Sequence, residues 1–450
     1  MSIVLFENKK DCCGCWACYN ICPKSAISMQ QDNEGFNYPV INNDLCVACG
    51  LCQRVCPIKT AVQREVDTFN QKHIGIINLQ YTENYGAVIA AAVLESVVRN
   101  IVGAEYIVET FKLNPYFPFK NRFEFAKDKA KSLGGWKFYF NDKFKHSQPT
   151  NADKLRSLRF TSFRFEFLNE SRTYQNADEI KKSPVNYAAF ITGSDIVWAP
   201  KKVDNFRADM HFLKFADENQ TAIAYAPSID SVVNKKLKSA SLLYKDALRH
   251  LDSISVREKS SVDFLQSLTD KKVYECCDPA FLVEPEYYDK MISAAEVKED
   301  KAKFIYVYIL EINDEIVEYA NKLAKEKNLK ICYYSKFHKN YSVNSEDCTS
   351  DGPAEFLYRL RNAEYVLTNS FHCVVFSLLF KKQFLSFTRS KISIKSTDLL
   401  DKFNLSERII TSDNKIDIDK PIDFDKVDEV IKNMKNDSLD YLKSALRLID

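Results

Sequence analysis

Eight cysteines near the N-terminus repeat one spacing twice. The two copies read Cys12-x2-Cys15-x2-Cys18-x3-Cys22 before Pro23, and Cys46-x2-Cys49-x2-Cys52-x3-Cys56 before Pro57. Three thiolates spaced in this way wrap one face of a four-iron four-sulfur cube, and the fourth, ahead of proline, binds the neighbouring cube. The spacing therefore predicts two 4Fe-4S clusters, one held by Cys12, Cys15, Cys18 and Cys56 and the other by Cys46, Cys49, Cys52 and Cys22.

Disulfides and zinc sites are the alternative uses for these thiols. Disulfides suit a small secreted domain, but the N-terminal residues MSIVLFENKKDCCGC contain no apolar signal core. Zinc sites usually pair two CxxC units across a longer gap, which leaves no use for the third and fourth cysteine of each copy. The spacing favours iron–sulfur clusters over both alternatives. Cys13 does not fit the pattern, and we assign it no role.

Over residues 5 to 62 the cysteine pattern resembles that of bacterial two-cluster ferredoxins. The resemblance implies a small α+β ferredoxin-like domain at 1–62. Between the two cysteine motifs, the sequence predicts a two-stranded excursion bearing Gly35. Residues 63–72 are polar and weakly patterned, so we expect a linker there.

A second set of polar residues stands where apolar runs end, further along the chain. The candidate catalytic residues are His372, Arg257 and Asp195, and the candidate substrate-binding residues are Asn84, Tyr85, Ser194, Asp278, Thr368, Asn369 and Ser370. A helix that opens at Ser370 exposes N–H groups that suit an anion. His372, in its first turn, can contact that anion or donate a proton. Arg257 can clamp a phosphate or carboxylate with two hydrogen bonds.

Each of these residues also has a purely structural interpretation. A lone histidine on an apolar helix is more often a packed residue, and an arginine beside Glu258 is more often part of a surface ion pair. Asn84, Asp195 and Asp278 suit helix caps and turns equally well. We interpret Cys373 as a small buried thiol in preference to a nucleophile.

The elements that must position these residues alternate along the chain from His73 onward. Short apolar strands are predicted at 73–80, 104–110, 188–195, 221–228, 253–258, 303–310, 329–335, 364–368 and 383–387, and helices at 87–101, 233–249, 258–268, 313–327, 353–361 and 370–381. This alternation predicts an α/β fold with parallel sheets. A charged run at 296–303 separates a lobe at 73–297 from one at 298–450. Ligands of such sheets bind beyond the carboxyl ends of the strands.

The segment 111–167 is rich in phenylalanine and basic residues. It holds 12 of the 31 phenylalanines, with 13 lysines and arginines against five acidic residues. A basic aromatic flap over an anionic substrate or a membrane surface is one interpretation. We favour amphipathic helices whose phenylalanines pack on the sheet, because the basic residues are spread along the segment.

Length and charge exclude several classes of protein. A chain of 450 residues predicts two or three domains. The 63 basic and 61 acidic residues nearly balance, so a nucleic-acid partner is not expected. No stretch approaches the roughly 18 uninterrupted apolar residues of a membrane span. We therefore expect a cytoplasmic protein without a transmembrane segment, with peripheral contact at the inner face of the membrane left open.

Six motifs at strand-to-helix turns of the larger region resemble those of the polysaccharide pyruvyl transferase family. They are NYGA at 84–87, GSDIVW at 193–198, AYAPS at 224–228, SVRE at 255–258, DPAFLV at 278–283 and TNSFH at 368–372, and residues 390–408 look like the family's closing segment. The resemblance implies two Rossmann-like lobes related to type-B glycosyltransferases. It also implies phosphoenolpyruvate as donor and a sugar hydroxyl of a surface glycan, or of its lipid-linked precursor, as acceptor. His372 and Arg257 match the family's donor-binding positions.

The two regions predict different kinds of chemistry. Pyruvyl transfer moves no net electrons, whereas the cysteine motifs are typical of redox centres. One hypothesis is a transferase of exopolysaccharide biosynthesis whose clusters stabilise it, sense redox state or dock a partner. Another is a reductive reaction fed by a redox partner protein, since no GxGxxG dinucleotide motif is present. The third is a non-catalytic electron-transfer or scaffold protein. The oxygen sensitivity of such clusters favours an anaerobic host.

Overall fold

The computed structural model divides the chain into two compact units. It describes residues 5–6, 12–32, 35–47, 51–56, 71–113, 150–199, 206–229, 240–297, 302–311, 313–335, 341, 344–387, 394–411 and 416–449. The smaller unit, here the head, comprises Met1–Gln71 with Pro184–Asn186, and the larger unit, here the body, comprises Lys72–Ser183 with Tyr187–Asp450. Most of the predicted linker at 63–72 lies outside the described residues.

The head contains a short hairpin and two short helices. Strands β1 (Ile27–Gln31) and β2 (Asn37–Ile41) pair antiparallel, and helices α1 (Ala17–Ile21) and α2 (Leu51–Arg54) lie within the first and the second cysteine motif. The hairpin lies between the motifs as predicted, with Gly35 in the positive-φ conformation that favours glycine. A small core gathers around Leu5, Ile27 and Cys52.

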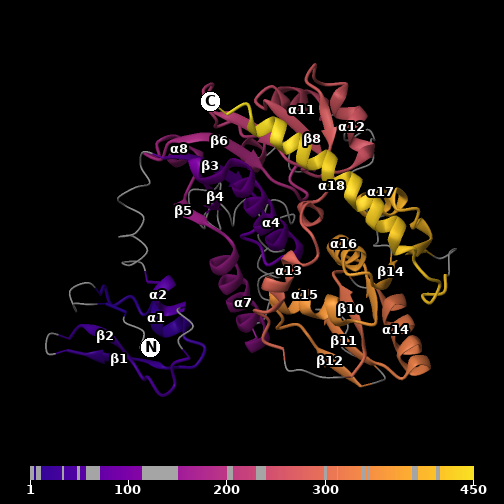
Figure 1. The fold of residues 1–450 in the computed structure, drawn as a ribbon, viewed down its shortest axis with the longest axis horizontal. Coiled ribbons are helices and arrows are strands. Elements are labelled where there is room, and N and C mark those ends of the chain that lie inside the picture. The colour runs from indigo at the N-terminus through magenta and orange to yellow at the C-terminus, as the bar shows by residue number, and fades with distance from the viewer. Residues whose placement is uncertain are drawn as a thin grey trace, which may run out of the picture. The chain divides into compact units, whose positions relative to one another are not determined.

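The first lobe of the body is built on a seven-stranded sheet (Figure 1). Its order is β5-β4-β3-β6-β7-β8-β9, and every pairing between neighbours is parallel. The strands are β3 (Lys72–Ile77), β4 (Tyr106–Leu113), β5 (Glu170–Tyr174), β6 (Tyr187–Thr192), β7 (Thr221–Ala224), β8 (Ser253–Val256) and β9 (Val273–Glu275). The helical elements are α4 (Tyr85–Val102), η2 (Gly103–Glu105), α7 (Asn151–Phe167), α8 (Ala177–Lys181), α9 (Phe206–His211), α11 (Ser241–Leu248), α12 (Lys259–Gln266), η3 (Pro279–Leu282) and α13 (Tyr287–Ile292).

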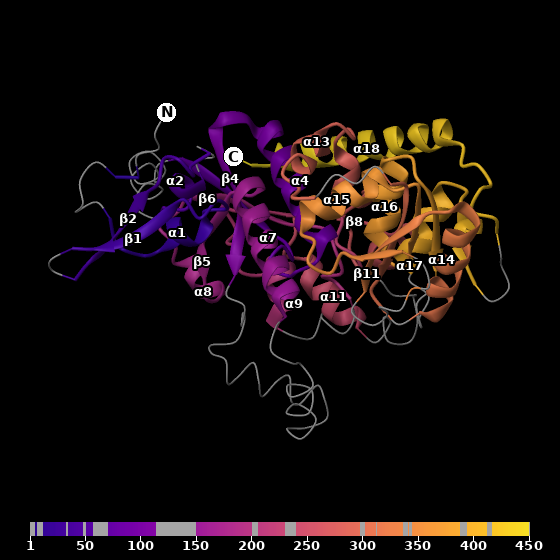
Figure 2. The same cartoon turned by 90° about the horizontal axis from the view of Figure 1, so that it is seen from below.

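The second lobe repeats this plan on a six-stranded sheet, which the view of Figure 2 shows from another side. The order is β12-β11-β10-β13-β14-β15, again parallel throughout. The strands are β10 (Phe304–Ile309), β11 (Lys330–Ser335), β12 (Ser345–Asp347), β13 (Tyr365–Thr368), β14 (Gln383–Phe387) and β15 (Ile409–Ile410), and the helices include α14 (Asp314–Lys327), α15 (Pro353–Asn362), α16 (Phe371–Leu379), α17 (Ile394–Lys402), η4 (Ser406–Arg408) and α18 (Phe424–Leu446). The predicted α/β fold with two parallel-sheet lobes is confirmed.

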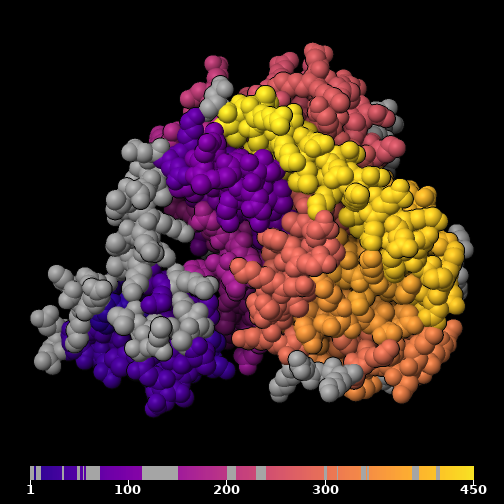
Figure 3. Space-filling model, in the orientation of Figure 1, coloured from indigo at the N-terminus to yellow at the C-terminus, as the bar shows by residue number. Residues whose placement is uncertain are grey.

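The last helix, α18, joins the two lobes. It begins beside the second lobe, where Lys381 pairs with Asp428 at 2.7 Å. Further along, the Tyr441 hydroxyl donates to the carbonyl of Ala224 in β7 at 2.7 Å, and Ser438 accepts from the amide of Cys277 at 2.9 Å. Figure 3 shows this helix in yellow, lying along the surface of the body. The predicted boundary of the second lobe at 298–450 therefore includes a helix that packs on both lobes.

Helix α4 is enclosed by the core of the first lobe. The stretch Tyr85–Glu105 is long and apolar enough to cross a membrane: an 18-residue window of it has a mean hydropathy of 1.7, but 61% of that window is buried in the protein. A core helix passes the same test of length and composition, so this one is weak evidence for a membrane span.

The phenylalanine-rich segment is partly described. Phe111 is buried in β4, and α7 opens with a capping box between Thr150 and Asp153. Phe160 and Phe163 of α7 are buried in the core of the body, as the amphipathic interpretation predicts. Residues 114–149 lie outside the described part of the chain.

Candidate functional site

Five of the candidate residues meet where strands of the first lobe end and a helix of the second lobe begins. Asp278 lies at the centre, with its Oδ2 atom accepting from Nη1 of Arg257 at 2.8 Å. The Ser194 hydroxyl lies 3.4 Å from the same oxygen, and Nε2 of His372 lies 3.5 Å from it. One carboxylate oxygen thus lies close to side chains from the turns after β6 and β8 and from α16.

The Asp278 carboxylate is held in place and held ionised. Its Oδ1 atom caps η3 by accepting from the amide of Ala280 at 3.1 Å. Burial would raise the pKa of Asp278, but the neighbouring His372 imidazole and the charge of Arg257 hold it well below the usual range. Asp278 therefore acts as a fixed negative charge that orients its neighbours.

Arg257 is a buried cation with donor capacity to spare. Its Nε atom lies 3.3 Å from Glu258, and its guanidinium lies over the Phe371 ring at 4.3 Å. Burial would lower the pKa of Arg257, but nearby Glu258 and Asp278 raise it above its ordinary value. The Nη2 atom has no hydrogen-bond partner among the described residues. A buried donor without a partner is costly, so this atom is well suited to bind a ligand.

His372 is fixed by close contact with a glycine of the other lobe. A Cβ added to Gly86, in the first turn of α4, would lie 1.9 Å from Cγ of His372. Only glycine therefore lets the α4 backbone approach the imidazole this closely. This contact gives the glycine of the NYGA motif a packing role that the sequence pattern did not reveal.

Asp195 lies in the same group and has an unusual backbone. Its φ is 96°, a conformation that non-glycine residues rarely adopt, and its side chain is buried. Burial would raise the pKa of Asp195, but the charges of Lys395, His372 and Arg257 lower it. The carboxylate also accepts from the amide of Ile196 at 2.7 Å.

Lys395 of α17 is the functional candidate that sequence reasoning missed. It is 8% exposed, and its Nζ lies 5.6 Å from the Phe371 ring, the same ring that Arg257 covers. Its charge acts on Asp195. The only signal in the sequence was its place within the closing segment at 390–408, where it is one of several lysines.

The remaining candidates form structural hydrogen bonds. Asn84 is the exposed N-cap of α4 and accepts from the amide of Ala87, while the buried Tyr85 hydroxyl donates to the carbonyl of Asp351 at 2.7 Å. Thr368 donates to the carbonyl of Tyr308 and accepts from the amide of Ser370. Asn369 accepts from the amide of Leu310 and donates to the carbonyl of Glu311. The buried Ser370 is the N-cap residue of α16, but its side chain makes no capping hydrogen bond. These residues shape the turns around the site.

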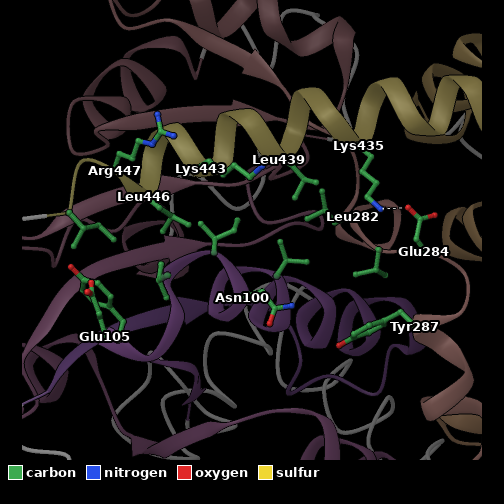
Figure 4. Close-up of a pocket in the computed structure, with 16 residues that line it drawn as sticks. Asn100, Glu105, Leu282, Glu284, Tyr287, Lys435, Leu439, Lys443, Leu446 and Arg447 are labelled. Atoms are coloured by element: carbon green, nitrogen blue, oxygen red, sulfur yellow. Dashed lines mark hydrogen bonds and ion pairs between the residues drawn. The ribbon is translucent and has the colours of Figure 1, made fainter.

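The space beside this group is small. A cavity of about 20 Å³ is lined by Arg257, Asp278, Phe371 and Lys395 among others. That volume holds about one water molecule. A substrate can therefore enter only if the surrounding side chains or the two lobes move apart. A much larger hollow of about 910 Å³ lies elsewhere, between α4 and α18 (Figure 4).

Two hollows of the head are lined by cysteines. The first is lined by Cys12, Cys15, Cys18 and Cys56, and also by Cys13 and Trp16. The second is lined by Cys22, Cys46 and Cys52, while Cys49 lies outside the described residues. This grouping agrees with the exchange of the fourth cysteine between the two motifs and supports the proposed ligand sets.

The thiols also suit iron–sulfur clusters in their surroundings. The amide of Gly14 donates to Sγ of Cys12 at 3.5 Å, and the amide of Ala26 donates to Sγ of Cys22 at 3.3 Å. Hydrogen bonds of this kind tune cluster potentials. Within the described residues no three His, Cys, Asp or Glu side chains converge on one metal ion. Thiolates that each bind a different iron of a cube need no such convergence.

The fold and the two sites define a two-lobed α/β protein with an iron–sulfur head, and sequence comparison identifies its family. The model of the polysaccharide pyruvyl transferase family matches residues 84–391. The model of the 4Fe-4S dicluster domain matches residues 11–60. The chain belongs to the polysaccharide pyruvyl transferase family and carries a 4Fe-4S dicluster domain at its N-terminus.

Curated relatives match the head alone. The pyruvate synthase subunit PorD of Thermotoga maritima is 39% identical over 62 residues, which is 14% of this chain and 57% of that protein. An uncharacterized ferredoxin of Methanocaldococcus jannaschii is 30% identical over 57 residues, which is 13% of this chain and 73% of that protein. The chain thus spans little more than half the length of the first relative.

Solved structures similar to the body are distant in sequence. The UDP-GlcNAc 2-epimerase of Neisseria meningitidis, bound to UDP-GlcNAc, is 11% identical with a TM-score of 0.40, and 84% of this chain and 95% of that chain are covered. The enzyme of Methanocaldococcus jannaschii in complex with UDP-GlcNAc and UDP is 10% identical with a TM-score of 0.41, over 81% of this chain and 93% of that chain. At this distance we draw nothing for this chain from their activities.

Proposed function

We propose that the body transfers the pyruvyl group of phosphoenolpyruvate to two hydroxyls of one sugar, forming a ketal and releasing phosphate. The acceptor would be a cell-surface polysaccharide or its lipid-linked precursor. The observation that carries this proposal is the convergence of Arg257, Ser194 and His372 on one oxygen of Asp278. Family membership sets the class of reaction, and this buried polar group supplies the kind of side chains that the reaction requires.

Phosphoenolpyruvate carries two anionic groups, which two buried cations can hold. Arg257 has an unpaired Nη2 donor, and a guanidinium can bind a phosphate or carboxylate with two parallel hydrogen bonds. Lys395 lies near the same Phe371 ring and can neutralise a second anion. Together they favour a dianionic donor over a neutral one.

His372 is placed to move a proton. In the proposed reaction the methylene carbon of phosphoenolpyruvate gains a proton, and a sugar hydroxyl forms a bond to the adjacent carbon and loses its own proton. A second hydroxyl then displaces phosphate from that carbon, loses its proton and closes the ketal ring. His372 donates the first proton and can recover one from a hydroxyl. Asp278 lies against the Nε2 atom of His372 and orients the imidazole ring. Asp195 orients the attacking hydroxyl as a hydrogen-bond acceptor.

The test is turnover with phosphoenolpyruvate under anaerobic conditions. The full chain, with its clusters reconstituted, is incubated with phosphoenolpyruvate and a panel of lipid-linked oligosaccharides. We expect phosphate release together with a product heavier by one pyruvyl group, detected by mass spectrometry. His372→Ala and Arg257→Ala should each reduce turnover by about a hundredfold or more.

Matched controls separate the site from general damage. His250 and Arg249 are exposed residues of the first lobe, and His250→Ala and Arg249→Ala should leave turnover unchanged. If no acceptor in a broad panel yields product, or if the two site variants turn over like the controls, the proposal fails.

The head favours a second candidate function, electron transfer. Two hollows lined by cysteines in the predicted ligand sets are the specific observation behind it. Bound 4Fe-4S clusters would exchange single electrons with a redox partner protein. If a reductive reaction uses those electrons, Cys15→Ser and Cys49→Ser should lower turnover with a reduced donor. Turnover unaffected by both substitutions would leave the clusters a structural or sensing role.

A further inference from the structure

The core of the body is left open along a groove between α4 and α18. Its floor includes Val97, Leu282 and Leu446, which are buried, and its walls come from α4, η3, α13 and α18. Seven partly buried apolar side chains pack against the core and also line the groove: Ile101, Val102, Tyr106, Val283, Tyr287, Leu439 and Ile449. In Figure 4 Leu439 and Leu446 point from α18 into the space above α4.

The size of the groove suits a small molecule. Its volume is about 910 Å³, near the upper end of the roughly 300–1,000 Å³ of ligand sites. Apolar lining with a few polar groups at the rim is the composition typical of such sites. The groove is separate from the Asp278 group, although η3 contributes to both: Asp278 caps the start of that short helix, and Leu282 at its end lines the groove.

The two ends of the groove differ in charge. At one end Lys435 and Glu284 neutralise each other at 2.6 Å, and Figure 4 shows this pair. Arg447 and Glu105 lie at the opposite end. The exposed side chains of Lys443 and Arg447 have no hydrogen-bond or ion-pair partner among the described residues. The rim therefore has two unpaired cations against the single carboxylate of Glu105.

We propose that this groove binds a single-chain alkyl phosphate, with the alkyl chain on the apolar floor and the phosphate at Lys443 and Arg447. An apolar chain needs no hydrogen-bond partner, and the floor offers none. A monoanionic or dianionic head complements the two unpaired cations at the rim. This site goes beyond the proposed transfer reaction and can be tested without it.

The probe is tetradecyl phosphate below its micelle concentration, titrated calorimetrically into the full anaerobic protein. We expect saturable binding of one molecule per chain, with a dissociation constant of about 0.1 mM or tighter, given the strength with which a 14-carbon chain partitions. Tetradecanol, which lacks the charge, should bind more weakly. Both results depend on ligand binding alone, so failure of the transfer reaction would not affect them.

Three variants locate the site. Leu439→Asp places a charge against the alkyl chain and should weaken binding at least about tenfold. The double variant Lys443→Glu with Arg447→Glu should weaken the binding of tetradecyl phosphate about fivefold or more and leave the binding of tetradecanol unchanged. Lys432→Glu, on an exposed position of α18 outside the groove, is the matched control and should bind like the wild type.

Leu439→Trp tests whether weaker binding comes from a folding defect. The new side chain is also apolar, but it is larger and occupies the groove. It should weaken binding while the thermal unfolding temperature stays within a few degrees of the wild type. No saturable binding, or binding that Leu439→Asp and Leu439→Trp leave unchanged, would overturn the proposal. So would an acidic amphipathic peptide, a phosphatidylglycerol vesicle or a second copy of the chain occupying the groove while tetradecyl phosphate does not.

Discussion

At the scale of single residues, the Oδ2 atom of Asp278 is the point on which the candidate site depends. Asp278→Asn would remove the carboxylate that pairs with Arg257 at 2.8 Å and leave this buried cation with the longer, 3.3 Å contact to Glu258. Loss of one partner from a buried ion pair costs roughly 3–5 kcal/mol, so we expect the free energy of unfolding to fall by that order. Transfer activity should be lost with it.

The pH dependence of this loss follows from the lowered pKa of Asp278. Such a group contributes stability that is present above its unfolded pKa, near 3.8, and is lost as the pH falls through the lower folded value. The difference in the free energy of unfolding between the wild type and Asp278→Asn should therefore stay constant from pH 6 to pH 8. Urea unfolding followed by circular dichroism measures it. The exposed Asp270→Asn serves as control. A difference that shrinks across this range would contradict the assignment.

Gly86 offers a second test at this scale, as a double-mutant cycle. Gly86→Ala would push the new Cβ into His372, so we expect a loss of activity of about tenfold or more. In a His372→Ala background the ring is gone, and Gly86→Ala should then cause almost no further loss. Equal losses in both backgrounds, measured by phosphate release, would show that Gly86 acts through helix geometry and not through His372.

At the scale of elements, a buried ion network joins α7 of the first lobe to the segment before α15 of the second. Asp351 lies 3.1 Å from Nε of Arg359 and 3.7 Å from Nη1 of Arg159, and Arg156 donates to the carbonyl of Thr349. Burial raises the pKa of Asp351 to about 6, against the opposing charges of Arg359 and Arg159. The network therefore contains a carboxyl that titrates close to neutral pH.

The sign of this shift predicts how the lobe contact responds to pH. A carboxyl with a raised pKa contributes stability below its unfolded pKa and loses it as the pH rises through the folded value. From pH 5 to pH 7.5 the free energy of unfolding of the wild type should fall by roughly 1–2 kcal/mol relative to that of Asp351→Asn. Urea unfolding at the two pH values measures this, with the exposed Asp440→Asn as control. If the free energy of unfolding of the wild type instead rose relative to that of Asp351→Asn as the pH increased, the prediction would be refuted.

Much of this architecture could be predicted from the sequence because most of the strands are apolar runs. The runs at 73–80 and 303–310 became β3 and β10 with small changes at their ends. The four strands that were not predicted, β5, β9, β12 and β15, all lie at sheet edges. They are short or mostly polar, with the sequences ESRTY, VYE, SED and II. Edge strands bury one side at most, so their composition resembles that of loops.

The site was predictable in its members and not in its geometry. His372 and Arg257 lie in recognisable motifs. That both lie close to one oxygen of Asp278 depends on how the two lobes pack together, which no local sequence pattern encodes. Lys395 was missed because one lysine among several looks like a solvated residue until packing buries it. Tyr85 shows the reverse case: its motif suggested ligand contact, and its ring stacks on Phe356 in the core.

At the scale of the whole molecule, the proposed exchange of cysteine ligands between the two motifs of the head has a measurable consequence. Cys56 belongs to the second motif by sequence but lines the hollow of the first motif, with Cys12. Cys56→Ser should therefore perturb the cluster of the first motif, and Cys22→Ser that of the second. Electron paramagnetic resonance of the reduced protein should show the signal of a different cluster in each variant. Each variant should lose up to about half of the bound iron. Cys13→Ser, at the extra cysteine, is the control and should retain both signals.

The division into two units predicts that the clusters and the body can be separated. The core of the head gathers around Leu5, Ile27 and Cys52, which is too little apolar burial to stabilise some 60 residues without bound metal. The body has an extensive core of its own. Removal of the clusters with an oxidant and a chelator should therefore unfold the head and shift the thermal transition of the body by less than about 2 °C. Calorimetry of the cluster-free and reconstituted proteins measures both transitions. A fall of several degrees in the body transition would instead mean that the folded head binds and stabilises the body, which would connect its redox state to the transfer site.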